Sequence, residues 1–225
     1  MEQMQILLAI LVLLPFVSAL LLALCGSDRM RRLIVYGSAG VLMISAVAFA
    51  VCFFSGENLQ LRFLQSGGII DHTMLALEAG FAVLITVLSI KYRRYYVAVL
   101  SIVQTVLTFV YELGGYKPAV QPYNLFTDQL TVIMVLIIAV VGTLITVYAV
   151  GYMRDYHNHH KEYTDRRRFF FAMLYVFLGA MFGLVLSNSL LWLYFFWEIT
   201  SLVSFLLIGY TRTKEAVQNS FRALW

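Results

Sequence analysis

One acidic side chain lies deep inside an apolar segment. Residues 190–210 are 21 residues long, and Glu198 is their only charged side chain. A segment of this length can cross a bilayer as a helix, and Glu198 would lie about 12 Å from its start at about 1.5 Å per residue. Inserting a charged carboxylate there costs roughly 2.5–3.5 kcal/mol. We therefore expect Glu198 to face a protein interior or a water path, and to move protons or ions.

Two further side chains are candidates for proton translocation with Glu198. Ser201 follows it by three residues on the same helical face, so its hydroxyl is expected to hydrogen-bond the carboxyl group. Glu78 lies five residues into another apolar segment. The alternatives are a protonated Glu198 that only bonds a neighbouring helix, and a Glu78 whose head simply reaches water at the outer face.

Other polar residues favour structural interpretations. Asp128 follows Thr127 just before an apolar run, which suits a helix N-terminus. The histidines of residues 157–160 lack a second cluster of metal ligands, so a solvated loop at a subunit contact is the preferred interpretation. We expect no metal and no cofactor, because no phosphate-binding loop, catalytic triad or haem pattern is present in the sequence.

The composition indicates an integral membrane protein. The chain is 61% hydrophobic and only 12% charged, whereas a soluble domain carries about 25% charged residues. Its net charge of +4 does not indicate nucleic-acid binding, because the basic residues lie in short loops between apolar blocks.

The predicted fold class is all-α: a polytopic membrane helix bundle of about seven transmembrane helices plus the start of an eighth. Residues 214–225 would begin the eighth helix. The third and fourth segments also suit a pair of interfacial or re-entrant helices, since the third contains Glu78 and the fourth contains Ser101, Gln104, Thr105 and Thr108. The seven segments are Ile6–Leu24, Leu33–Phe54, Thr73–Ile90, Tyr95–Tyr111, Leu130–Gly151, Phe169–Leu186 and Leu190–Tyr210.

The basic residues predict an orientation. With the N-terminus outside, 14 of the 16 lysine and arginine residues fall in inside loops, and only Arg62 and Lys117 fall outside. Positive charge is retained on the cytoplasmic side, so this split supports seven spans in an inner (cytoplasmic) or equivalent energy-transducing membrane. Residues 112–129 are expected to form a turn-rich outside loop, because they contain two adjacent glycines and two prolines.

The second half of the chain resembles a known family. Asn124–Met134, Val147–Met153 and Met181–Asn188 are followed by Trp197-Glu198 and Ser204–Tyr210. Their order and spacing resemble the large antiporter-like membrane subunits of respiratory complex I. That family also includes Mrp-type cation/proton antiporter subunits and the membrane arms of energy-converting hydrogenases. The resemblance covers about residues 120–225, and residues 1–119 match only as apolar spans.

The resemblance implies that Glu198 is the acid of a proton half-channel, working with a lysine on a later helix. That lysine would lie beyond Trp225, so we expect the chain to be the N-terminal portion of such a subunit. Residues 1–119 would be N-terminal helices that include an extra hairpin, and residues 120–225 the first part of the channel domain. The family commonly has glycine where Ser201 stands and tyrosine where Phe205 stands.

Three functions remain open at this point. The first is a proton-translocating subunit of a redox-driven pump, such as NADH:quinone oxidoreductase or a membrane-bound hydrogenase. The second is an Mrp-type sodium/proton antiporter subunit, and the third is a structural membrane anchor. Each implies other membrane subunits and the lipid bilayer as partners.

Overall fold

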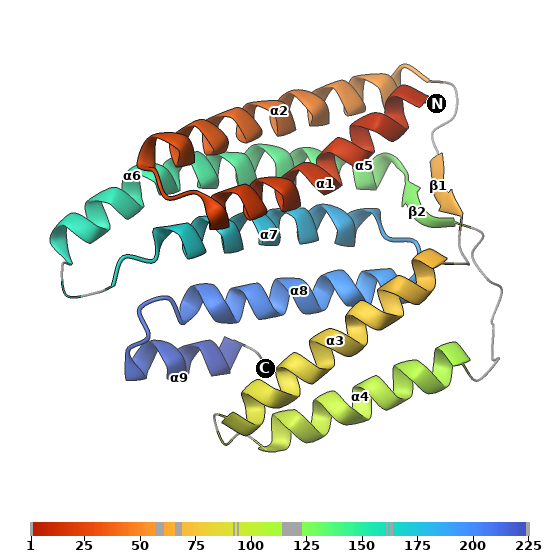
Figure 1. The fold of residues 1–225 in the computed structure, drawn as a ribbon. Coiled ribbons are helices and arrows are strands. Elements are labelled where there is room, and N and C mark those ends of the chain that lie inside the picture. The colour runs from red at the N-terminus through yellow and green to blue at the C-terminus, as the bar shows by residue number, and fades with distance from the viewer. Residues whose placement is uncertain are drawn as a thin grey trace.

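Long helices form almost all of the computed structural model, which describes residues 2–56, 61–65, 69–91, 93, 95–113, 123–160, 162 and 164–223 (Figure 1). The first four helices are α1 (Glu2–Leu24), α2 (Asp28–Phe54), α3 (Ile69–Lys91) and α4 (Tyr95–Leu113). The later ones are α5 (Gln129–Ile137), α6 (Thr143–His159), α7 (Arg167–Leu186), α8 (Leu190–Ile208) and α9 (Lys214–Ala223). A π-helical turn, η1 (Ile138–Gly142), joins α5 to α6 in one continuous rod.

The expected helix bundle is confirmed, with a helix at each of the seven predicted spans and at the start of the eighth. Within the described residues, six helices are long and apolar enough to cross a membrane, and Tyr95–Val110 adds a shorter apolar stretch. Their outer faces expose large apolar side chains such as Leu13, Ile44 and Leu144. This is a multi-pass membrane protein, because water would not solvate such surfaces.

Helix α7 lies at the centre of the bundle, packed between α1 and α8. Gly179 and Gly183 are one helical turn apart and allow this close approach. A Cβ atom at Gly179 would lie 2.9 Å from the ring of Phe16 on α1, and one at Gly183 would lie 2.4 Å from the ring of Phe196 on α8. The two glycines therefore allow α7 to pack closely against both neighbours, as pairs of small residues do in membrane helices.

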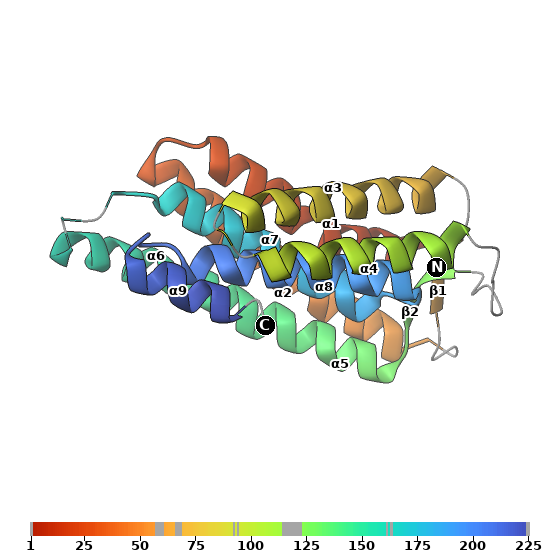
Figure 2. The same ribbon diagram turned by 90° about the horizontal axis from the view of Figure 1, so that it is seen from below.

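The hairpin of α3 and α4 covers the side of α8 that faces away from α7. It lies below α8 in Figure 1, and Figure 2 shows α4 in front of α8. The ring of Phe81 on α3 meets that of Phe195 on α8 edge to face, with centroids 5.7 Å apart. The third and fourth spans are thus a real helical hairpin that packs on the helix carrying Glu198.

A short two-stranded sheet was not predicted. Strand β1 (Leu61–Gln65) pairs antiparallel with β2 (Tyr123–Thr127), with Leu61 opposite Thr127 and Gln65 opposite Tyr123. Both strands lie in segments expected to be loops, and five residues are too few to stand out by periodicity. The glycines and prolines of the predicted turn, residues 114–122, lie outside the described residues.

Helix α6 extends further than expected. The fifth predicted span ended at Gly151, whereas the helix continues to His159. Tyr148, Tyr152 and Tyr156 stack along it with ring centroids 6.1 Å apart. His157 and His159 each bond the carbonyl oxygen four residues earlier. A polar sequence was therefore misread as loop, although its side chains support the helix.

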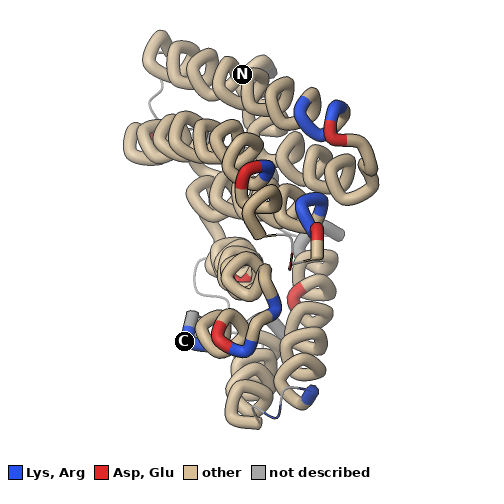
Figure 3. Tube along the Cα trace, turned by 90° about the vertical axis from the view of Figure 1, so that its left-hand side faces the viewer, with Lys and Arg blue, Asp and Glu red and all other residues tan. Residues whose placement is uncertain are grey.

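The loops expected inside gather at one end of the bundle, on the left in Figure 1. Figure 3 looks onto this end and shows lysine and arginine residues around it. We call it the basic end. The α1–α2, α6–α7 and α8–α9 connections meet there, whereas the N-terminus and the β-strands lie at the opposite end. That the N-terminus faces outside remains a prediction.

Candidate functional site

Helix α8 holds Glu198 half-buried near its middle, facing the α3–α4 hairpin. One carboxylate oxygen, Oε1, accepts two hydrogen bonds. The hydroxyl of Tyr194, one turn earlier on α8, donates from 2.5 Å. The side-chain amide of Gln104 on α4 donates from 2.7 Å. The other oxygen, Oε2, is buried and accepts no hydrogen bond from any described residue.

A cavity of about 280 Å³ opens beside Glu198, between α4 and α8. Apolar side chains form most of its wall, and the polar groups gather near the carboxylate. No lysine or arginine lines it within the described part of the chain. The lining residues are Ile85, Val97, Leu100, Ser101, Gln104, Tyr194, Trp197, Glu198, Ser201 and Leu202. A carboxyl group beside such a space has an unused oxygen with which to exchange a proton.

Glu78 lies in the same region but is more deeply buried. Its side chain on α3 is only 2% exposed, so the alternative in which it reaches water at the outer face is wrong for this structure. Its charge is close enough to act on the Tyr194 hydroxyl, as the charge of Glu198 does. Tyr194 is therefore near both acids that the sequence singled out.

Ser201 lies at the cavity but does not make the expected bond. Its hydroxyl donates to the backbone carbonyl oxygen of Trp197 at 3.1 Å. Serine in a helix commonly bonds the carbonyl four residues earlier, and this bond competes with the carboxylate. Ser201 is thus a wall residue of the cavity, whereas Tyr194 and Gln104 bind Glu198.

The sequence reasoning missed these two donors for different reasons. Tyr194 precedes Glu198 by four residues, so helical spacing alone brings them together. Only Ser201 was expected to bond the carboxyl group from the same helix. Gln104 stood out as polar in an apolar span, but its partner depended on how the hairpin packs. That packing is a tertiary contact across 94 positions.

The other candidate residues have structural roles. Asp128 caps α5 as predicted, and its carboxylate accepts a 2.8 Å hydrogen bond from the Thr131 backbone amide. That bond lowers the pKa of Asp128. The Nε2 atom of His157 lies 3.1 Å from the hydroxyl of Tyr210, so this histidine packs against the end of α8 rather than lying in a solvated loop. Among the described residues, no cluster of His, Cys, Asp or Glu could hold a metal ion.

Two family models match the second half of the chain. Residues 121–170 match the model described as NADH-ubiquinone oxidoreductase (complex I), chain 5 N-terminus. Residues 187–224 match the model described as the NADH:quinone oxidoreductase/Mrp antiporter transmembrane region. This part of the chain therefore matches the antiporter-like membrane subunit family. Within it, Tyr194, Glu198 and Ser201 lie in the second matched region, whereas Glu78 and Gln104 lie outside both.

Curated relatives include bacterial members of this antiporter-like family. The chain is 34% identical over 122 residues to Na(+)/H(+) antiporter subunit A1 of Staphylococcus haemolyticus, which covers 54% of this chain and 14% of that protein. It is 28% identical over 161 residues to the subunit of the same name in Staphylococcus aureus strain JH9, covering 64% of this chain and 19% of that protein. The chain therefore spans less than a fifth of the length of these relatives.

Proposed function

We propose that this chain is an ion-translocating part of an Mrp-type sodium/proton antiporter assembly, in which Glu198 takes up and releases a proton. The observation that carries the proposal is the position of Glu198, half-buried in the middle of a membrane helix beside a cavity. The similarity to subunits named Na(+)/H(+) antiporter subunit A1 favours the sodium/proton alternative over the redox-driven pump.

The geometry supports a proton step at Glu198. In the ionised state, Tyr194 and Gln104 both donate to Oε1 and hold the carboxylate in one orientation. Oε2 remains available for a proton. Glu78, whose charge also acts on the Tyr194 hydroxyl, is a candidate for the next carrier. Ser201 would contribute as a polar group in the cavity wall.

The test measures sodium-dependent pH changes in vesicles that contain the intact assembly and receive no electron donor. The wild type is expected to release protons on sodium addition. Glu198→Gln should lose nearly all of that signal, because an amide cannot ionise. The matched control is Glu215→Gln, which makes the same change on an exposed residue of α9, and it should transport normally.

Other outcomes would assign a different function. A pH change that needs an electron donor rather than sodium would support the redox-driven pump. Transport by Glu198→Gln at the wild-type rate would contradict the role of Glu198 and leave the structural anchor as the better account. Assembly of each variant is checked by co-purification, so that a lost subunit is not mistaken for lost transport.

A further inference from the structure

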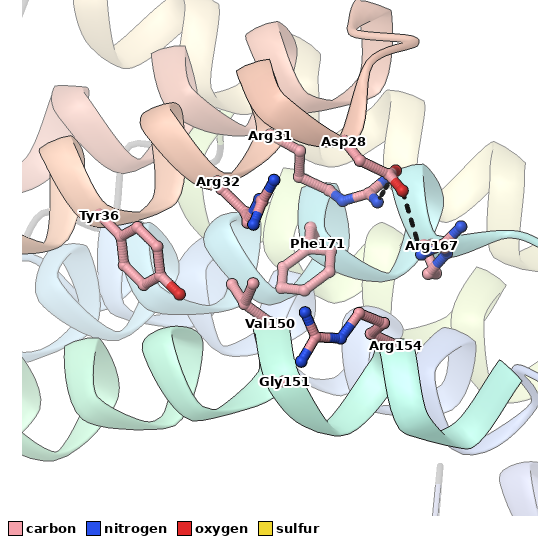
Figure 4. Close-up of a pocket in the computed structure, with 9 residues that line it drawn as sticks. All are labelled: Asp28, Arg31, Arg32, Tyr36, Val150, Gly151, Arg154, Arg167 and Phe171. Carbon is pink, nitrogen blue, oxygen red and sulfur yellow. Dashed lines mark hydrogen bonds and ion pairs between the residues drawn. The ribbon is translucent and has the colours of Figure 1, made fainter. Parts of the chain in front are cut away.

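A second cavity, at the basic end, has a different chemical character. It has a volume of about 170 Å³ and lies between α2, α6 and α7 (Figure 4). Four arginines and one aspartate supply its charged groups. Its lining residues are Asp28, Arg31, Arg32, Tyr36, Val150, Gly151, Arg154, Arg167 and Phe171. This cavity is separate from the Glu198 site, which lies between α4 and α8.

The positive charge of this arginine cavity is only partly neutralised. The carboxylate of Asp28 contacts Arg31 and lies 3.5 Å from Arg167. Arg167 also pairs with Asp165 at 2.6 Å, and Arg154 lies 3.8 Å from the exposed Asp155. Within the described residues, Arg32 makes no ion pair. The surplus of cations therefore favours an anionic ligand.

Part of the cavity wall is built into the fold, whereas Arg32 and Arg154 are exposed. The side chain of Arg31 is 8% exposed, and its guanidinium lies 5.7 Å from the centre of the Phe171 ring. Helices α2 and α7 both begin at this cavity, with Asp28 and Arg167 as their first residues. The positive ends of two helix dipoles therefore add to the field of the arginines.

The surroundings of the cavity indicate a lipid rather than a soluble anion. From Tyr36, the face of α2 continues one turn at a time through Gly40 to the exposed Ile44. On α6, Leu144 lies about two turns before Gly151, on the same face, and is also exposed. Apolar surface thus runs from the cavity toward the centre of the membrane on two neighbouring helices. A molecule with an anionic head and apolar chains matches both parts.

We propose that the arginine cavity binds the phosphate of an anionic phospholipid, with the acyl chains lying along α2 and α6. Basic pockets between membrane helices at the cytoplasmic side bind such headgroups. Arg32 and Arg154 approach the space from opposite helices in Figure 4 and provide the donors, while Arg31 and Arg167 are held by Asp28. Tyr36 lies at the junction of headgroup and chains, where tyrosine is favoured.

The test is a lipid titration of the purified assembly followed by native mass spectrometry. The probe is phosphatidylglycerol, and phosphatidylethanolamine with the same acyl chains is the zwitterionic control. Arg32→Gln/Arg154→Gln should weaken phosphatidylglycerol binding about thirtyfold, since each basic side chain near an anionic lipid contributes roughly a fivefold factor. Binding of phosphatidylethanolamine should be weak and the same in both proteins.

A second double variant controls for the loss of two charges. Lys214→Gln/Arg222→Gln removes two cations from α9, outside the cavity, and should bind phosphatidylglycerol like the wild type. Equal weakening by both double variants would overturn the site in favour of general charge attraction. Displacement of the lipid by millimolar inorganic phosphate would show a soluble-anion site instead. Unchanged binding in Arg32→Gln/Arg154→Gln would overturn the proposal outright.

Discussion

The side-chain amide of Gln104 lies 2.7 Å from the carboxylate of Glu198, although 94 positions separate the two residues. The bond joins α4, in the hairpin outside the matched family regions, to the acid inside them. The hairpin is therefore part of the Glu198 environment and not merely an attachment to the bundle.

The first prediction follows from this bond. Gln104→Leu should lower the transport rate about tenfold or more, because hydrogen bonds to charged groups contribute roughly 1.5–3 kcal/mol and tenfold corresponds to about 1.4 kcal/mol. The measurement is the sodium-dependent pH change in vesicles. Thr105→Val, on the same helix, removes a hydroxyl that donates to the Ser101 carbonyl oxygen and, among the described residues, to no other group. It should leave transport near the wild-type rate, and a matching loss there would argue against Gln104.

Much of the fold could be predicted because bilayer thickness imposes long apolar runs, and alternating charge identifies their ends. The position of Glu198 followed from the same pattern. Its surroundings did not, because Gln104 and Glu78 reach α8 through packing between helices distant in sequence. The end of α6 was missed for another reason. Residues 152–159 are mostly polar, so no apolar run marked this end of the helix, although Met153 is buried in the core and stacked rings and local histidine bonds support the helix.

A second prediction concerns the contact between α7 and α8. Gly183→Ala would place a Cβ atom 2.4 Å from Phe196, so the ring or the helices must shift. Overpacking of this kind costs about 1–3 kcal/mol, and thermal unfolding in detergent should show the loss. At Gly37 of α2, an added Cβ meets no atom within 4 Å. Gly37→Ala should therefore be neutral or stabilising, and equal destabilisation at both positions would contradict this account.

A third prediction concerns acid sensitivity at the α6–α7 connection. The hydrogen bond from Arg167 lowers the pKa of Asp165 from 3.8 to about 2. A carboxylate whose pKa is lowered by folding stabilises the folded state above its unfolded pKa of about 3.9, and this contribution is lost as the pH falls toward 2.

Unfolding midpoints measured between pH 4 and pH 2 can isolate this contribution. The wild type should lose stability more steeply in this window than Asp165→Asn, which should also be less stable at neutral pH. Asp155→Asn removes an exposed carboxylate on α6 that lies 3.8 Å from Arg154 and should change the slope less. Identical slopes in the wild type and Asp165→Asn would refute the predicted link.

The last prediction tests whether the two donors to Glu198 act as one unit. Tyr194 and Gln104 both donate to Oε1, so removing either leaves the other to hold the carboxylate. Removing both frees it entirely. Tyr194→Phe and Gln104→Leu should each lower transport, and the double variant should lose more than the product of the single effects. Coupling between groups in contact is on the order of 0.5–3 kcal/mol. Multiplicative losses would mean that the two donors act independently, for example if Tyr194 serves mainly Glu78 rather than Glu198.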